Sequence, residues 1–269
     1  MINKAKELDQ FYTNKETAIL CYERLLNFIK ENNIDIIDMT WLEPSAGSGS
    51  FYNLMPDKKI GIDIEPKIES IIKSDFLQYT LPPEKYITLG NPPFGKNSNL
   101  AVKFFNKCSL YSEIVAFIVP KTFKKDSLKN KLDNKMHLVQ EWDIDDFSFV
   151  LEEKSVNVPC VFQIWKKSDS IREKIKNLTQ VEGLLFCDKD TADIAFQRVG
   201  ANAGRIKHQD RFEFISPCSH IFIKVTDLKD IALLEKIDWS EIKYNTAGNP
   251  SISKSELIRE YLKEKSKIS

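Results

Sequence analysis

Residues 89–95 read Leu-Gly-Asn-Pro-Pro-Phe-Gly and combine the groups that a planar, hydrogen-bonding ligand requires. Two consecutive prolines fix φ and remove two N–H donors, so we expect a stiff loop rather than the interior of a strand or helix. Asn91 supplies one acceptor and two donors, and Phe94 supplies a flat face. This pair suits a nucleobase. An ordinary Asn-Pro turn at the end of a strand is the alternative interpretation.

Glycines and carboxylates with ligand-binding chemistry precede this loop. Gly47 and Gly49, in LEPSAGSGSF, permit a tight turn whose backbone can approach a ligand closely. Asp63, in GIDIEP, is placed where a carboxylate accepts hydrogen bonds from two ribose hydroxyls, and Asp75, in KSDFL, suits an adenine amine. A single Asp at a strand end is more often a cap or turn former. Their succession, ending at the diproline loop, predicts one binding site.

Segments of alternating type must position these residues. Apolar spacing predicts helices over residues 16–33 and 97–111, and a short helix over 69–76 that leads into a strand. Strands are predicted within residues 39–45, 58–66, 85–95, 112–123, 137–149 and 158–167, and the strand in residues 85–95 ends at the diproline loop. Alternating strands and helices predict an α/β fold, a Rossmann-like, doubly wound, mostly parallel sheet that binds ligands at the carboxyl ends of its strands.

Composition favours a soluble, intracellular protein. The 269 residues are 42% hydrophobic and 29% charged, with a formal net charge of zero. The polar N-terminus has no signal core, and no stretch approaches the ~20 apolar residues of a membrane span, so we expect a cytoplasmic protein without membrane contact. The five cysteines are scattered without a CxxC pair. We therefore expect reduced thiols and no metal site.

Charge is unevenly distributed along the chain. Residues 96–131 contain eight lysines and two acids, whereas residues 132–153 contain seven acids and one lysine. The lysine-rich block is compatible with a basic surface beside the diproline loop, and Lys121, Lys124 and Lys125 are the candidates for contact with a phosphate backbone. The alternative is that both blocks are the solvated sides of two helices.

The motifs, taken in order, resemble those of S-adenosylmethionine-dependent methyltransferases that act on adenine N6. EPSAGSGSF, GIDIEP, SDFL and GNPPFG carry the resemblance, and LDQFYTNKETA precedes them as in the gamma class of DNA adenine methyltransferases. The resemblance covers roughly residues 8–165. It implies S-adenosylmethionine as the cofactor, a catalytic domain over residues 1–165, and a small α+β target-recognition or accessory region over residues 166–269.

The resemblance also implies roles for individual residues. Asn91 and the carbonyl of Pro92, in a loop completed by Pro93, would hold the target amine, and Phe94 would stack on the base. Many relatives have Tyr at this last position; stacking survives the change, but a hydroxyl contact does not. The implied cofactor contacts are Gln10, Tyr12, Thr13, Glu43, Pro44, Ala46, Gly47, Gly49, Asp63, Ile64, Asp75, Phe76 and Asn91.

Further contacts to nucleic acid are expected outside these motifs. Phe149, or else Phe147, is the candidate for a second aromatic wall around the base, with a place in the core as the alternative. Residues 198–214 set Arg198 and Arg205 around two glycines, which suits a loop over phosphates or, equally, a solvated hairpin turn. Beyond them, a strand is predicted over residues 219–225 and a Ser-capped helix over 253–265.

The sequence therefore favours a monomeric enzyme that methylates the exocyclic N6 of adenine in DNA, with the target base flipped out of the duplex. An RNA adenine methyltransferase would grip the base in the same way. Enzymes that methylate a glutamine amide also use such loops, but the early DQFYT segment and the C-terminal extension of about a hundred residues count against that reading. A non-catalytic nucleic-acid-binding module of the same fold is the remaining alternative.

Overall fold

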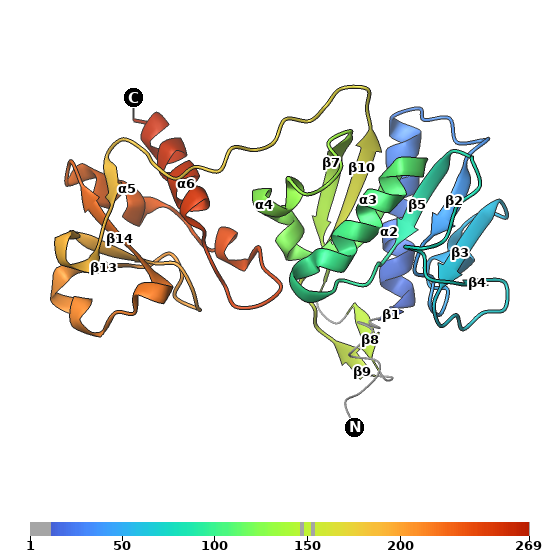
Figure 1. The fold of residues 1–269 in the computed structure, drawn as a ribbon, viewed down its shortest axis with the longest axis horizontal. Helices are drawn as coiled ribbons and strands as arrows, with labels where there is room; N and C mark the ends of the chain where they lie inside the picture. Colours follow the sequence, from blue (N-terminus) through green and yellow to red (C-terminus); the bar gives the residue numbers. More distant parts are fainter. Residues whose placement is uncertain (1–11, 146–147, 152–153, 269) are drawn as a thin grey trace. The chain divides into compact units, whose positions relative to one another are not determined.

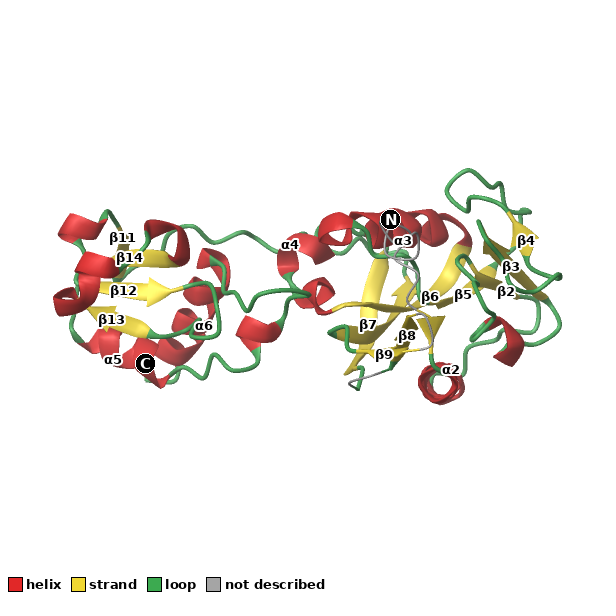
Figure 2. Cartoon of the chain, turned by 90° about the horizontal axis from the view of Figure 1, so that it is seen from below, coloured by secondary structure: helices red, strands yellow, loops and turns green. Residues whose placement is uncertain are grey.

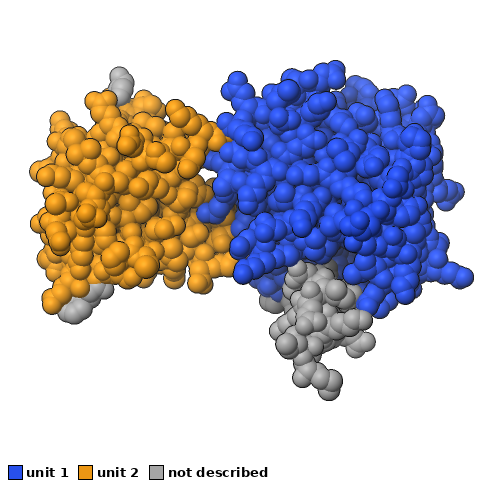
Figure 3. Space-filling model, viewed as in Figure 1, with its two compact units in different colours: residues 1–174 blue, residues 175–269 orange. Residues whose placement is uncertain are grey.

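The protein is described by a computed structural model that covers residues 12–145, 148–151 and 154–268. Its chain forms two compact units, residues 1–174 and residues 175–269 (Figure 3). The division follows Lys174, nine residues beyond the boundary after residue 165 that the sequence resemblance implies. None of the described helices is both long enough and apolar enough to cross a membrane.

A seven-stranded sheet forms the centre of the first unit (Figures 1 and 2). Its spatial order is β4-β3-β2-β5-β6-β10-β7, and β10 runs antiparallel to both of its neighbours while the other pairs are parallel. This confirms the predicted Rossmann-like, mostly parallel sheet. The strands are β2 (Thr40–Glu43), β3 (Lys59–Asp63), β4 (Ile72–Lys73), β5 (Tyr86–Gly90), β6 (Ser112–Pro120), β7 (Met136–Asp143) and β10 (Cys160–Lys167).

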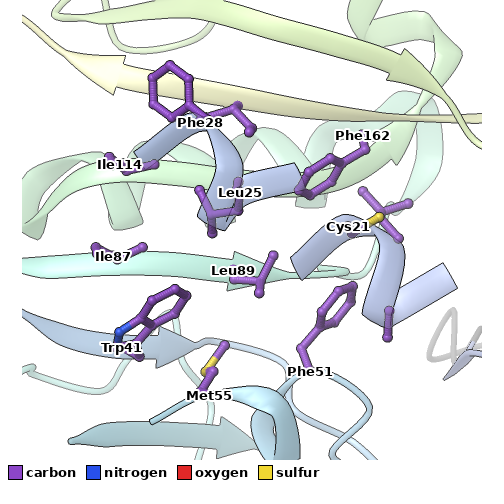
Figure 4. Packing of buried hydrophobic residues seen from close by; sticks show 14 of the residues in the cluster. Cys21, Leu25, Phe28, Trp41, Phe51, Met55, Ile87, Leu89, Ile114 and Phe162 are labelled. Carbon is purple, nitrogen blue, oxygen red and sulfur yellow. The ribbon is translucent and has the colours of Figure 1, made fainter. Parts of the chain in front are cut away.

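Helices cover both faces of this sheet, α2 (Lys15–Glu31) one face and α3 (Asn99–Tyr111) the other (Figure 2). Alternate residues of the central strands pack against each helix. Ile87 and Leu89 of β5 lie on the face that α2 covers, in one cluster with Leu25 and Phe28 of that helix (Figure 4). Because both faces of β6 are buried, its sequence reads as a continuous apolar run rather than an alternating one.

The predicted short helix over residues 69–76 is wrong. This segment forms turns and then the two-residue strand β4, which pairs with β3 through Ile72 and Ile62. A helix this short forms too few hydrogen bonds to offset the free energy of helix nucleation. Pairing with the edge of the sheet gives the same backbone N–H and C=O groups their hydrogen-bond partners. The remaining helices that the sequence predicted in this unit are confirmed, and Asn14 caps α2 by accepting from Thr17 N at 2.8 Å. A further short helix, α4, spans Asp126–Lys129.

A second, three-stranded sheet brings the early segment of the chain to the first unit. Its order is β1 (Tyr12–Thr13), β8 (Phe149–Leu151) and β9 (Lys154–Val156), all antiparallel. Thr13 pairs with Phe149, and Asn14 N donates to Ser148 O at 3.0 Å. The early segment is thus tied to a region more than a hundred residues away in the sequence.

The second unit contains a four-stranded antiparallel sheet with helices on one face. The order is β11-β14-β12-β13, and the helices are α5 and α6. A capping box at Ser253 and Glu256 starts α6, which confirms the predicted Ser-capped helix, and the unit has the predicted α+β character. The bounds are β11 (Leu184–Phe186), β12 (Ile194–Gln197), β13 (Ile206–His208), β14 (His220–Val225), α5 (Lys229–Lys236) and α6 (Lys254–Ser266).

Candidate functional site

A cavity of about 590 Å³ lies at the carboxyl ends of β2, β3 and β5. Neighbouring parallel strands end at the same edge of a sheet, so residues far apart in sequence meet there. Most of the residues that the resemblance assigned to the cofactor line this one cavity: Tyr12, Thr13, Glu43, Pro44, Ala46, Gly47, Asp63, Ile64, Asp75, Phe76 and Asn91. Gln10 lies outside the described residues.

The glycine turn after β2 needs its glycines for two separate reasons. Gly47 has φ +48°, and a Cβ there would lie 2.8 Å from the ring of Tyr12. Gly49 has φ +81°, and a Cβ there would overlap the side chain of Ile68. Both positions therefore combine a backbone conformation that favours glycine with a lack of space. Gly49 is outside the cavity lining, and it shapes the turn through its N–H, which donates to Ala46 O at 2.6 Å.

Asp63 holds the backbone on both sides of it. One carboxylate oxygen accepts from Gly47 N at 2.8 Å and the other from Glu65 N at 2.7 Å. Each carboxylate oxygen can accept more than one hydrogen bond, so the side chain can fix the glycine turn and still receive a ligand hydroxyl. Asp75 behaves similarly at the end of β4, where it accepts from Leu77 N at 2.9 Å.

Glu43 is the most buried acid of the cavity wall, with 2% of the residue exposed. Its Oε2 has no hydrogen-bond partner among the described residues. Burial raises the pKa of this carboxyl well above its ordinary value; a hydrogen bond from the Tyr52 backbone lowers the pKa, and the charge of Asp63 raises it further. Because β2 lies between β3 and β5, Glu43 stands between the strand ends that carry Asp63 and Asn91.

The diproline loop contributes part of its residues to the cavity. Asn91 and Pro93 line it, whereas Pro92 is buried and outside the lining. Asn91 Nδ2 donates to Thr13 Oγ1 at 3.2 Å, and Ser45 Oγ donates to the Asn91 carbonyl at 3.0 Å. These contacts hold the amide at the strand end. The structure therefore brings Asn91 and the predicted cofactor residues to a single site.

Phe94 is half-buried and packs against the core clusters on both sides of the sheet. Its carbonyl accepts from Leu100 N at 3.1 Å and Ala101 N at 3.2 Å, so the residue also ties the loop to the start of α3. The following Gly95 has φ +67°, and a Cβ there would lie 2.7 Å from Leu100 Cβ. Phe94 is outside the cavity lining.

Thr13 connects the early segment to the site. Its carbonyl accepts from Ser50 Oγ at 2.8 Å, beside the contact of its hydroxyl with Asn91. Across the same strand pair, Phe149 is fully buried in the core cluster that α2 covers. The structure thus favours the core alternative for Phe149 over a role as the second aromatic wall, because a buried ring presents no face to a base. Phe147 lies outside the described residues.

The lysine-rich and acidic blocks meet at the end of β7. Asp143 forms ion pairs with Lys121 at 2.9 Å and with Lys124 at 2.5 Å. Burial raises the pKa of Asp143, but the hydrogen bonds and charges of the two lysines outweigh burial and leave the pKa below its ordinary value. Two of the three lysines predicted to contact phosphate are therefore partly neutralised by the acidic block.

Arg198 and Arg205 belong to the second unit, at the connection between β12 and β13. Gln197 N donates to Arg205 O at 2.8 Å, so the connection is a hairpin turn, and Gly204 has φ +98° beneath the side chain of Trp239. Arg205 is exposed and Arg198 half-buried. The sequence predicted either a loop over phosphates or a solvated hairpin turn, and the local structure is a hairpin turn. Contact of the two arginines with phosphates stays a prediction.

Several lining residues were missed by the sequence analysis, notably Ser45, Lys96, Leu100 and Phe104. Two signals were available. Lys96 directly follows the diproline motif, and Leu100 and Phe104 share one face of the predicted helix at a spacing of four residues. Among the described residues, no group of three or more His, Cys, Asp or Glu side chains is arranged to hold a metal ion.

A scan against protein-family models finds no match, and a search of curated proteins finds no significant one. Among solved structures, the 23S rRNA methyltransferase ErmE is similar over 60% of this chain and 70% of its own, with 15% identity and a TM-score of 0.41. Thermoplasma acidophilum 1320 is similar over 59% of this chain and 89% of its own, with 17% identity and a TM-score of 0.43.

A third solved structure, a DrdV–DNA complex, is similar over 61% of this chain but only 27% of its own, with 12% identity and a TM-score of 0.45. The fold assignment itself rests on the strand order and directions described above, in particular on the antiparallel β10 between β6 and β7.

Proposed function

We propose that the protein is an S-adenosylmethionine-dependent methyltransferase that acts on the exocyclic N6 of adenine in DNA. The observation that carries this proposal is that Asn91 of the diproline loop lines the same cavity as the carboxylates Asp63 and Asp75. A nucleoside-binding pocket and an amine-binding amide thus share one space, which is the arrangement that transfer from a nucleoside cofactor to an amino group requires.

The residues of the cavity fit this cofactor. Asp63 supplies acceptors for ribose hydroxyls, and Asp75 supplies an acceptor for the adenine amine, with Ile64 and Phe76 as apolar neighbours. Gly47 lines the cavity and has no Cβ, so a ligand can approach the backbone of the turn closely. The buried Oε2 of Glu43, which has no hydrogen-bond partner in the described part of the chain, suits a ligand that carries positive charge.

The bound cofactor would supply a methyl group already activated by a sulfonium, so the chain need only position and polarise the acceptor. An exocyclic amine is a poor nucleophile because its lone pair is delocalised into the ring. The Asn91 amide and the Pro92 carbonyl would draw that amine towards a tetrahedral nitrogen and localise its lone pair. The contact of Asn91 Nδ2 with Thr13 orients the amide for this task.

Adenine in a duplex hides its N6 in the base stack, so a DNA substrate would have to be flipped out at a cost of about a few kcal/mol. Phe94, a half-buried residue of the diproline loop, would offer its ring for stacking with the extruded base. The same cavity would accept adenine from single-stranded RNA, or a glutamine amide of a protein, without the flipping step.

The test is methyl transfer from labelled cofactor to duplex DNA, single-stranded RNA and a protein extract, measured side by side. We expect label in DNA, with N6-methyladenine as the product identified by mass spectrometry, and an increase in melting temperature with excess cofactor. Transfer only to RNA or to protein would replace the proposed substrate. Absence of any cofactor-dependent change in melting temperature would contradict the proposed activity altogether.

A further inference from the structure

Glu43 lines the cavity, but the proposed function does not yet say which part of the cofactor it would contact. The strand ends follow one another in the order β3, β2, β5, so the acid stands between Asp63 and Asn91. If Asp63 takes the ribose and Asn91 takes the target amine, the part of the cofactor that reaches Glu43 is the one between ribose and transferred methyl. That part carries the sulfonium.

The electrostatic setting of Glu43 is unusual for an ionised carboxylate. Its Oε2 is buried without a hydrogen-bond partner among the described residues, and the side chain contacts Gly90, where a Cβ would lie 3.4 Å from Glu43 Cγ. The carboxyl receives one backbone hydrogen bond, from Tyr52, and burial outweighs it. Burial without further partners disfavours the ionised form, whereas a neutral carboxyl is tolerated. A ligand cation close by reverses this preference.

We propose that Glu43 is neutral in the free protein and loses its proton when the cationic cofactor binds, so that the site recognises the cofactor's charge and holds the neutral thioether product less tightly. In this step the O–H bond of the carboxyl breaks and the proton passes to solvent, with no redox change. The inference rests on the proposed function, because it requires that S-adenosylmethionine be the ligand.

None of the other ionisable groups that line the cavity makes a hydrogen bond to Glu43 Oε2 in the described part of the chain. Asp63 and Asp75 come from neighbouring strand ends and are acids, and Tyr12 from β1 is a neutral phenol whose pKa is raised by burial and then by Asp63 and Glu65. Lys96 is the basic residue of the lining and follows the diproline loop. The charge of Asp63 further raises the pKa of Glu43, in the same direction as burial.

Calorimetry of the full-length protein tests the inference. Cofactor binding is measured at neutral pH in two buffers of different ionisation enthalpy, which gives the number of protons released. The ligands are S-adenosylmethionine, the cationic non-reactive analogue sinefungin and the neutral product S-adenosylhomocysteine. We expect proton release with both cationic ligands and a smaller release with the product.

Glu43→Gln keeps the shape of the side chain and removes its charge. We expect this variant to lose the proton release and to lower the preference for S-adenosylmethionine over S-adenosylhomocysteine by about tenfold or more, since a unit charge a few ångströms away contributes strongly in a buried site. Glu69→Gln, at an exposed position outside the cavity lining, is the matched control and should behave like the wild type.

A second measurement keeps the inference testable if Glu43→Gln fails to fold. The ¹³C chemical shift of the Glu43 carboxyl in the wild-type protein should move from the neutral to the ionised value when cofactor is added. Tight cofactor binding with no proton release, or unchanged release in Glu43→Gln, would overturn the inference and leave the proposed function intact. Failure of the wild type to bind cofactor would overturn both.

Discussion

At the scale of single residues, the carboxylate of Asp63 combines two tasks. It holds the glycine turn through Gly47 N and the following loop through Glu65 N, and it faces the cavity where the ribose is proposed to bind. Asn91 is set up differently, because its amide contacts Thr13 of the early segment and its carbonyl contacts Ser45. These two residues should therefore separate cofactor binding from chemistry.

Asp63→Ala should weaken cofactor binding by roughly ten- to a hundredfold, because a charged acceptor for two hydroxyls is worth about 1.5–3 kcal/mol. The loss should include a looser glycine turn, since Gly47 N loses its acceptor. Calorimetry with S-adenosylmethionine measures the change. Asp57→Ala, an exposed acid before β3, serves as the control and should bind normally. Equal affinities for the two variants would contradict the ribose role of Asp63.

Asn91→Ala should leave cofactor affinity nearly unchanged and reduce single-turnover transfer by about a hundredfold, because the lost contact matters most as the nitrogen becomes tetrahedral. The measurements are calorimetry for the cofactor and single-turnover transfer to the nucleic acid identified as substrate. Asn99→Ala, exposed at the start of α3, is the matched amide control. If Asn91→Ala transferred methyl groups at the wild-type rate, Asn91 would not hold the target amine and the diproline loop would have only a structural role.

At the scale of elements, the site is built from turns that only a few backbone conformations allow. The turn after β2 depends on positive φ at Gly47 and Gly49, and the loop after β5 depends on positive φ at Gly95. The glycines and prolines lie within the turns, but the side chains that pack against the turns come from other segments. Tyr12 packs against Gly47, and Ile68 packs against Gly49. Each turn is thus held by contacts with a second element.

Gly47→Ala should destabilise the protein by at least about 1 kcal/mol and abolish cofactor binding, because the new Cβ is strained at positive φ and meets the Tyr12 ring. Thermal unfolding and calorimetry measure the two effects. Gly248→Ala is the matched control, since a Cβ there meets nothing within 4 Å, and its melting temperature should stay close to that of the wild type. Similar melting temperatures for both variants would show that the turn has another conformation in solution.

At the scale of the whole molecule, the binding cavity belongs to one unit. All of its lining residues lie between Tyr12 and Phe104, within the unit of residues 1–174. The second unit has its own core of residues from β12, β14, α5 and α6, which a separate domain requires. Cofactor binding and target recognition are therefore expected to divide between the units.

A fragment of residues 1–174 should fold and bind S-adenosylmethionine with an affinity within about threefold of that of the full chain, because the complete cavity is within it. Transfer to nucleic acid should fall much further, since the proposed recognition region is removed. Calorimetry and labelled transfer measure the two activities. Full transfer by the fragment would assign target recognition to the first unit.

Replacing Lys121, Lys124 and Lys125 with Ala should weaken nucleic-acid binding and reduce the slope of log K against log[salt]. The reduction should be smaller than the ~0.9 per lysine expected if each of the three neutralised one phosphate. The reason for the reduced effect is the pairing of Lys121 and Lys124 with Asp143. Asp143→Asn should act in the opposite direction and strengthen binding at low salt. An unchanged salt slope in both variants would place these lysines outside the nucleic-acid interface.

The sequence by itself determined the order of the strands along the chain, the main helices and the residues at each strand end. It could do so because these features depend on local apolar spacing and on glycine and proline, whose backbone limits act within a few residues. Asp63 and Asn91 were recognisable for the same reason: they lie at the ends of β3 and β5 in a fold that gathers strand ends. Asp75 follows the exposed edge strand β4, which the sequence analysis predicted as a helix.

Only the tertiary structure decided what these residues touch. The burial of Phe149 depends on a strand pair with Thr13, and the pairing of Asp143 with two lysines depends on where β7 ends. The short helix predicted over residues 69–76 gave way to pairing with β3. Likewise, Glu43 is buried because its strand β2 lies between β3 and β5. Contacts between distant segments set these outcomes, and local sequence patterns carry no record of them.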